Sequence, residues 1–329
     1  MPWITGCIWV QVRSVAAALA VVACGTAGCD RPGAPQSGAQ PNPSTNPQPI
    51  RSEARPAAPS TGLSETDYPA WRKTFKTKLV TTGPAPQPWG PTAAPKGVSV
   101  VTYESDGRKL KAWVDSTATQ KGSPKPAVLF LHGGFAFGDD DWEQAEPFLR
   151  AGFHVLVPIL RGENGQPGAF SLHLGEADDA LAALTALAAL PGVDAKNLFV
   201  SGHSVGGTLA MFVALATDQV RAAAPISGAP NCATHLKGQE ALAPFDTSVP
   251  AEFMTRSPAS FARFFKCPVR AYYGTQEVSF FDTDTRLMEQ IARAAGHDVR
   301  AERLPGNHMS VVDPAMRRAI EFFREHTAR

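Results

Sequence analysis

A serine flanked by glycines is the strongest chemical signal in the sequence. Gly202-His203-Ser204-Val205-Gly206-Gly207 lies between an apolar stretch typical of a strand and one typical of a helix. A tight strand-to-helix turn strains the serine backbone and leaves room only for glycine two residues to either side. It exposes the hydroxyl and aims the Val205 N–H at the same point, where a helix N-terminus favours an anion. The pattern predicts a nucleophilic Ser204, with Gly202 and Gly206 required by the turn.

A glycine pair follows an earlier apolar run, in His132-Gly133-Gly134-Phe135. Glycines let the backbone approach a substrate closely, and loop N–H groups can hold the oxyanion of a tetrahedral intermediate. Losing one such donor lowers the rate by about 10²- to 10³-fold. We expect the Gly134 N–H to act together with that of Val205, with the Phe135 N–H as the alternative to Gly134.

A serine hydroxyl also needs a base and an acid that orients the base. Among the eight histidines, His308 alone lies between the last predicted strand and the last predicted helix. In a serine triad with the chain order serine, acid, histidine, the base belongs in this loop. Glu277 follows the predicted strand Val269–Tyr273, and we expect it to be the acid, with Asp282 as the rival. Asp284 is expected to cap the next helix.

Strand-like and helix-like segments alternate around these residues, and each candidate group follows the end of a strand. A parallel sheet would gather them at one edge. We therefore predict an α/β fold, with a mostly parallel eight-stranded sheet and helices on both faces. The predicted strands are Val98–Tyr103, Leu110–Val114, Ala127–His132, His154–Pro158, Asn197–Ser201, Ala222–Ser227, Val269–Tyr273 and Val299–Leu304; the predicted helices are Trp142–Arg150, Glu176–Leu190, Gly206–Thr217, Thr283–Ala295 and one capped by Asp313-Pro314.

Residues 228–266 break this alternation, since they contain no clear strand. Inserts of this kind on a parallel sheet often form a lid over the site. The aromatic residues near the site suggest an apolar pocket, although core packing is expected to account for most of them. They are Phe135, Phe137, Trp142, Phe245, Phe253, Phe261, Phe264 and Phe265.

Four segments together resemble a known family: HGGF, LRGENGQPGAF, GEADD and VSGHSVGG. From about Val98 to the C-terminus, the sequence resembles the catalytic domain of the prolyl oligopeptidase family and the dienelactone-hydrolase-like proteins. The resemblance implies the α/β-hydrolase fold and serine chemistry. The chain departs from those peptidases in two ways. The 267 residues from Leu63 onward leave no room for a β-propeller, and glutamate stands where the acid is usually aspartate.

These features predict a serine hydrolase that cleaves ester or amide bonds of a small ester or short peptide through an acyl-enzyme at Ser204. A carboxylesterase without peptidase activity is the alternative. A non-catalytic binding lipoprotein is a third hypothesis, but the intact set of catalytic groups argues against it. Asp139-Asp140-Asp141 could anchor a substrate amine, but helix capping is the expected role.

The N-terminal residues indicate export. Arg13 precedes a short apolar run that ends in Val-Val-Ala-Cys24, and residues 1–23 fit a signal sequence of the lipoprotein kind. We expect a cell-envelope protein with a lipid anchor on Cys24, or on Cys29, and a soluble secreted or periplasmic protein as the alternative. Residues 24–62 are rich in proline and poor in large apolar residues, which predicts a disordered linker before a catalytic domain at residues 63–329.

The composition of the chain limits the classes of partner and cofactor that can be expected. The 329 residues carry a formal net charge of +1 without a basic stripe, which argues against a nucleic-acid partner. The sequence contains no metal-binding motif and no Gly-rich nucleotide loop, so neither a metal nor another cofactor is predicted. Cys232 and Cys267 belong to the domain, and their pairing and the oligomeric state stay open.

Overall fold

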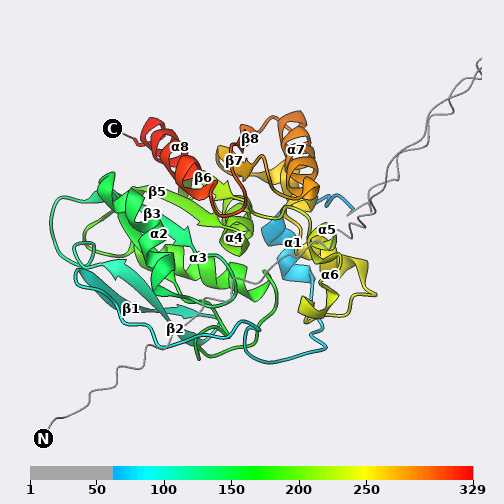
Figure 1. Cartoon of the computed structure of the whole chain (residues 1–329), viewed down its shortest axis with the longest axis horizontal. Coiled ribbons are helices and arrows are strands. Elements are labelled where there is room, and N and C mark those ends of the chain that lie inside the picture. The colour runs from blue at the N-terminus through cyan, green and yellow to red at the C-terminus, as the bar shows by residue number, and fades with distance from the viewer. Residues whose placement is uncertain (1–61, 329) are drawn as a thin grey trace, which may run out of the picture. The chain divides into compact units, whose positions relative to one another are not determined.

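The structure is a computed structural model that describes residues 62–328 (Figure 1). The expected signal sequence, the linker up to residue 61, Cys24 and Cys29 lie outside the described residues. Among the residues that are described, no helix combines the length and the apolar character that a membrane crossing requires.

A single eight-stranded sheet organises the fold, with the strand order β1-β2-β4-β3-β5-β6-β7-β8. β1 pairs antiparallel with β2, and β2 pairs antiparallel with β4. All later pairings are parallel, which confirms the mostly parallel sheet. The strands are β1 Val98–Ser105, β2 Arg108–Asp115, β3 Lys125–Leu131, β4 His154–Pro158, β5 Val193–His203, β6 Val220–Ile226, β7 Val269–Gly274 and β8 Val299–Leu304.

Helices cover both faces of the sheet, as predicted. α3 and α4 pack with α1 and η2 in one apolar cluster, and α2 and α8 pack in another cluster on the opposite face. The long helices are α2 Asp139–Arg150, α3 Gly175–Ala188, α4 Val205–Ala216, α7 Ser279–Ala294 and α8 Val312–Glu325. Asp284 lies in the second turn of α7, so its predicted capping role is wrong; α7 begins four residues earlier than expected.

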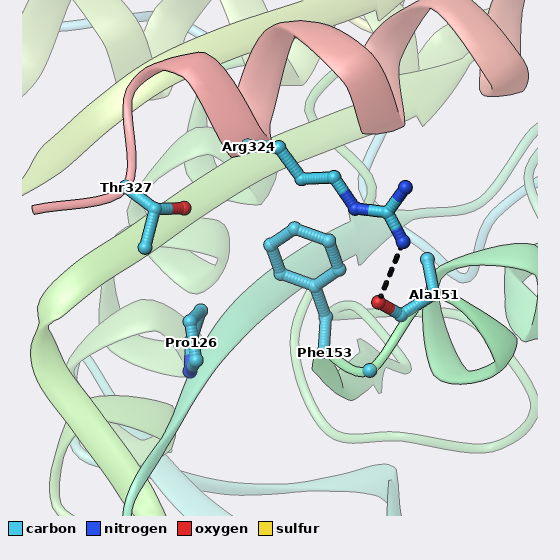
Figure 2. A pocket seen from close by; sticks show the side chains of 6 residues that line it. Pro126, Ala151, Phe153, Arg324 and Thr327 are labelled. Atoms are coloured by element: carbon cyan, nitrogen blue, oxygen red, sulfur yellow. Dashed lines mark hydrogen bonds between the residues drawn. The ribbon is translucent and has the colours of Figure 1, made fainter. Parts of the chain in front are cut away.

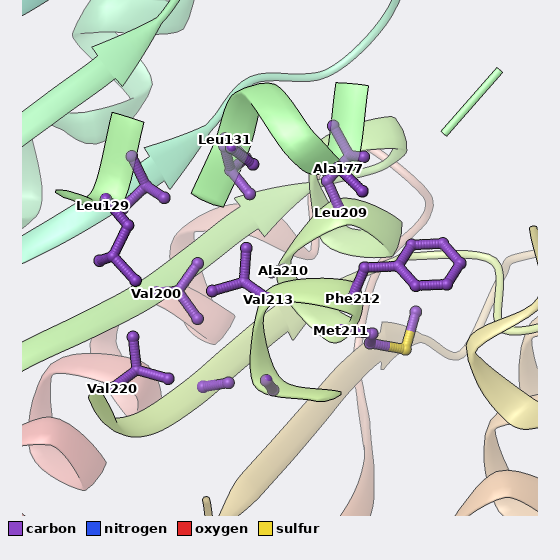
Figure 3. Packing of buried hydrophobic residues seen from close by; sticks show 14 of the residues in the cluster. Leu129, Leu131, Ala177, Val200, Leu209, Ala210, Met211, Phe212, Val213 and Val220 are labelled. Atoms are coloured by element: carbon purple, nitrogen blue, oxygen red, sulfur yellow. The ribbon is translucent and has the colours of Figure 1, made fainter. Parts of the chain in front are cut away.

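α4 packs against the sheet within the larger apolar cluster (Figure 3). Ten consecutive residues of α4, from Gly206 to Leu215, are buried. Phe212 and Val213 belong to the same apolar cluster as Leu129 of β3 and Val200 of β5, and the Phe212 ring packs against that of Tyr68 in the cluster, with centroids 4.8 Å apart. A helix that is apolar on every side belongs inside a protein. This burial fixes α4, and with it the turn that precedes α4, relative to the sheet.

The insert at residues 228–266 forms short helical segments: α5 Cys232–Leu236, η1 Glu240–Leu242, α6 Pro250–Thr255 and η2 Pro258–Phe264. α1 (Tyr68–Thr74), which the sequence analysis did not predict, lies beside them (Figure 1), and Trp71 Nε1 donates to Thr255 Oγ1 at 2.8 Å. Phe261 and Phe265 are buried in the main core. The η2 half of the insert is therefore part of the folded body rather than a detachable cover.

The long loop after β4 is held by a buried ion pair. Arg161 donates from Nε to Asp179 Oδ2 at 2.9 Å and from Nη2 to Asp179 Oδ1 at 2.7 Å. The Arg161 backbone N–H also donates to Asp179. Glu176 accepts from the backbone and the hydroxyl of Ser171 further along the same loop. The acidic residues at the start of α3 thus anchor this loop, which borders the site described next.

Candidate active site

The glycine-flanked serine lies on the predicted turn between β5 and α4. Ser204 has φ 56° and ψ −117°, a strained conformation for a residue with a side chain. A Cβ on Gly202 would lie 2.6 Å from the Leu131 carbonyl oxygen, and a Cβ on Gly206 would overlap the same carbonyl. The close approach of this turn to β3 explains why both positions are glycine.

The three predicted triad residues lie in hydrogen-bonding contact. His308 Nε2 is 3.0 Å from Ser204 Oγ, and His308 Nδ1 is 2.6 Å from Glu277 Oε1. The Gly274 N–H donates to Glu277 Oε2 at 2.7 Å, so both carboxylate oxygens are engaged. These contacts join the ends of β5 and β7 to the loop after β8.

The structure separates Glu277 from its rival. Asp282 accepts from the Tyr273 hydroxyl and from Arg286 in α7, and it makes no hydrogen bond to His308. Burial on its own raises the pKa of Glu277, but the hydrogen bonds from His308 and the Gly274 N–H outweigh burial and hold that pKa below its usual range. An ionised carboxylate at this position suits the stabilisation of an imidazolium.

Two backbone N–H groups, one on the serine turn and one on the neighbouring loop, have no acceptor of their own within residues 62–328; a Cβ placed on Gly133 of that loop would lie 3.6 Å from Ser204 Cβ. Val205 is the first residue of α4, so its N–H has no carbonyl one turn earlier in the helix. The Gly134 N–H donates to no acceptor within residues 62–328. The Phe135 N–H, the alternative to Gly134, donates to Gln87 Oε1 at 2.9 Å. The geometry therefore favours Gly134 over Phe135 as the second donor.

His132 orients the Gly134 N–H. Its Nδ1 donates to the Gly133 carbonyl oxygen at 2.9 Å, and its Nε2 lies 3.0 Å from Glu163 Oε2. Because the carbonyl and the N–H of one trans peptide point in opposite directions, the Gly134 N–H faces away from the buried His132 ring. Burial lowers the pKa of His132, but the carboxylates of Glu163 and Asp141 outweigh burial and raise that pKa to about 10. His132 thus supports this loop from its buried side.

His203 has a structural role that sequence reasoning missed. Its Nε2 donates to the His308 carbonyl oxygen at 2.8 Å, and its ring centroid lies 4.7 Å from that of His308. Burial and the charge of His308 lower the pKa of His203 to about 4, so the ring is neutral near pH 7. The middle residue of the serine turn thus fixes the loop that carries His308. In the sequence, the position of His203 next to Ser204 was the feature that could have indicated this role.

The acidic residues after the Gly133–Gly134 loop cap a helix. Asp141 accepts from the Gly138 N–H at 2.8 Å, while Asp139 and Asp140 are exposed in the first turn of α2. This is the capping arrangement that the sequence analysis preferred to an amine anchor.

Most of the aromatic residues expected near the site lie in the core. Phe137, Trp142, Phe245, Phe261 and Phe265 are buried. Phe135 is half-buried and packs edge-on against Phe170, with ring centroids 5.0 Å apart. Sequence reasoning missed Phe281 at the start of α7, whose ring centroid lies 5.5 Å from that of His308.

A shallow pocket lies at the opposite edge of the sheet and has no part in this site (Figure 2). Pro126, Phe153 and Arg324 line it, and Arg324 Nη2 donates to the Ala151 carbonyl oxygen at 3.1 Å. Pro126 is near the amino end of β3, whereas Ser204 follows the carboxyl end of β5.

Within residues 62–328, no group of three or more histidine, cysteine or carboxylate side chains is placed to hold a metal ion. Cys232 and Cys267 are buried free thiols.

Comparison with known proteins identifies the family. Residues 128–325, more than half of the chain, match the description "Alpha/beta hydrolase family". The chain belongs to that family. The match includes Ser204, Glu277 and His308. No curated protein matches the sequence.

Solved structures of peptidases and esterases share the fold. A puromycin-hydrolyzing peptidase of Mycobacterium tuberculosis superposes with a TM-score of 0.60 at 20% identity, over 70% of this chain and 40% of that one. The Pyrococcus furiosus esterase Pf2001 superposes with a TM-score of 0.59 at 16% identity, over 77% of this chain and 100% of the esterase. A putative dienelactone hydrolase of Klebsiella pneumoniae superposes with a TM-score of 0.55 at 16% identity, over 69% of this chain and 98% of that one. The chain spans well under half the length of the peptidases that it matches.

Proposed function

We propose that the protein is a serine hydrolase that cleaves ester or amide bonds through an acyl-enzyme at Ser204. The observation that carries the proposal is the continuous chain of contacts from Ser204 Oγ through His308 to Glu277, at 3.0 and 2.6 Å. The N–H groups of Val205 and Gly134, for which residues 62–328 contain no acceptor, lie on the serine turn and on the loop next to it. This arrangement supplies a nucleophile, a base, an orienting carboxylate and oxyanion donors at one edge of the sheet.

In the first half of the reaction, His308 Nε2 takes the proton of Ser204 Oγ while the oxygen attacks the carbonyl carbon. The electrons of the carbonyl π bond move to its oxygen, which the N–H groups of Val205 and Gly134 stabilise. Glu277 holds the Nδ1 proton and stabilises the imidazolium. When the tetrahedral intermediate collapses, His308 returns the proton to the leaving alcohol or amine.

In the second half, water takes the place of the leaving group. His308 accepts a proton from the water while the hydroxide oxygen adds to the acyl carbon, and the same N–H groups hold the new oxyanion. Collapse breaks the bond to Ser204 Oγ, which recovers its proton from His308. The carboxylic acid product leaves, and the enzyme returns to its starting state.

One observation favours small esters over peptides as substrates. Asp141, which could have helped to anchor a substrate amine, is engaged in capping α2. A carboxylesterase is therefore the narrower form of the proposal.

The test is turnover of a series of p-nitrophenyl acyl esters beside aminoacyl and Xaa-Pro p-nitroanilides, using the full chain and its Ser204→Ala variant. Ester turnover that disappears in the variant supports the esterase form, and anilide turnover that disappears supports a peptidase. If neither substrate class is turned over, the proposal fails and the non-catalytic binding protein becomes the better hypothesis.

We also propose export and lipid anchoring through Cys24, with Cys29 as the alternative; both lie outside the described residues, and support comes from the sequence pattern alone. Metabolic labelling with a palmitate analogue is expected to label the full chain and its Cys29→Ala variant, but not its Cys24→Ala variant. Labelling lost only in Cys29→Ala would assign the anchor to Cys29. An unlabelled full chain would favour a soluble exported protein.

A further inference from the structure

Gln87 contacts residues 132–135, here called the oxyanion loop, from outside the part of the chain that matches the family. Its Oε1 accepts from the Phe135 N–H at 2.9 Å, across 48 positions of sequence. A Cβ on Gly134 would lie 2.6 Å from the same oxygen, so the amide of Gln87 lies directly against Gly134. The family match begins only at residue 128.

The segment that carries Gln87, residues 77–89, is here called the strap. At its start, Thr77 Oγ1 and the Lys78 N–H donate to the buried carboxylate of Glu252 in α6, and the Val80 N–H donates to the Pro244 carbonyl oxygen. These contacts join the strap to the insert, so this end of the strap is fixed.

The other end of the strap is attached to the loop after β4. The Ala85 N–H donates to the Gly162 carbonyl oxygen at 3.0 Å, and the Phe170 N–H donates to the Gly83 carbonyl oxygen at 2.9 Å. Trp89 lies against Gly165, 3.6 Å from a Cβ placed there. Gln87 lies between two anchored positions, so its amide is presented to the oxyanion loop at a low cost in conformational entropy.

Gln87 and His132 together fix the two peptides that flank Gly134. His132 holds the Gly133 carbonyl oxygen, which sets the plane of the peptide containing the Gly134 N–H. Gln87 holds the Phe135 N–H, which sets the plane of the next peptide. Gly134 has φ +67°. Glycine adopts positive and negative φ about equally readily, so Gly134 alone does not fix the orientation of the two peptides that flank it.

We propose that Gln87 is a positioning residue of the oxyanion hole: by holding the Phe135 N–H, it keeps the loop in the conformation that leaves the Gly134 N–H free for the substrate oxyanion. This inference rests on the proposed serine hydrolase function. It adds a group supplied by the strap, which lies outside the matched family region. Gln87 acts through Gly134 and need not touch the substrate.

The test replaces Gln87 by methionine, which has a similar length but lacks the amide oxygen. Losing one hydrogen bond that favours the active loop conformation is expected to lower kcat about three- to tenfold. KM is expected to stay unchanged, because the loop N–H matters most when the oxyanion forms. The rate of phosphonylation by a fluorophosphonate should fall by the same factor, since that reaction also develops charge on an oxygen in the hole.

Gln166 offers a matched control. Its Oε1 accepts from the Lys111 N–H at 3.1 Å, a contact of the same kind made with β2 instead of the oxyanion loop. We expect Gln166→Met to keep the wild-type kcat, and both variants to keep the wild-type melting temperature and pH profile. An unchanged kcat in Gln87→Met would overturn the inference. A higher kcat would also overturn it, because Gln87 would then compete with the substrate for the loop.

The two proposals fail in different ways. If the wild-type chain neither turns over esters or anilides nor reacts with the fluorophosphonate, the serine hydrolase function fails. If the wild-type chain is active and Gln87→Met matches it, only the positioning role fails. Equal losses in Gln87→Met and Gln166→Met, with lower melting temperatures, would assign both contacts to stability alone.

Discussion

Replacing Glu277 by glutamine should slow catalysis strongly while leaving the fold intact. Glu277 lies 2.6 Å from His308 Nδ1, and its side chain is only 2% exposed. At a charge separation of ~4 Å and an effective dielectric constant of ~20, its attraction for the imidazolium is about 4 kcal/mol, or about a thousandfold in rate. The His308 side chain is 37% exposed, so solvent screens part of this attraction. We expect kcat/KM for a p-nitrophenyl ester to fall about 10²- to 10³-fold.

Asp282→Asn is the matched control for this measurement. Asp282 also follows β7, but it contacts Tyr273 and Arg286 instead of His308. Its substitution is expected to leave kcat/KM within about threefold of the wild-type value, since surface changes of this kind have small effects. The assignment of the acid would be refuted by a Glu277→Gln variant within tenfold of wild type at an unchanged melting temperature, or by an equal loss in Asp282→Asn.

Three further predictions concern the framework of the site. Gly206→Ala places a Cβ against the Leu131 carbonyl, so the free energy of unfolding measured with urea should fall by at least about 1–3 kcal/mol; an unchanged value would contradict the close packing of the turn. Asp179→Asn leaves the Arg161 charge buried without its partner, and we expect a loss of about 3–5 kcal/mol in the same assay, whereas a neutral effect would show that water reaches the pair. The pKa of His132 is raised to about 10 in the folded state against about 6.5 when unfolded. Its proton therefore stabilises the fold fully below pH 6.5, and this contribution should disappear between pH 6.5 and 10; urea titrations of wild type and His132→Gln should converge across that range, and parallel curves would contradict the charged state.

Local chemistry explains what could be predicted from the sequence. The serine turn requires its glycines within five consecutive residues, so Ser204, Gly202 and Gly206 are recognisable without any tertiary information. His308 was predicted from chain order, because a parallel sheet brings the loops after its strands to one edge. The strands β4 and β8 have the predicted bounds, and the other predicted strands differ by a few residues at their ends.

The remaining assignments in the site depend on tertiary contacts, which the sequence does not show. Glu277 and Asp282 both follow β7, and only their contacts separate their roles: Glu277 lies against His308, whereas Asp282 accepts from Tyr273 and Arg286. Gln87 lies in a segment without periodic apolar residues, so nothing in its own sequence indicates that it reaches Phe135. α1 could have been predicted, because Asp67 caps it and Tyr68 and Trp71 share a face at helical spacing.

Covalent labelling of the folded full chain with a fluorophosphonate reports directly on whether Ser204 is an activated nucleophile. We expect one equivalent of label, located on Ser204 by peptide mass spectrometry, with labelling abolished in Ser204→Ala and strongly slowed in His308→Ala. A folded chain that takes up no label, or one labelled at a different residue, would contradict the proposal that Ser204 is an activated nucleophile.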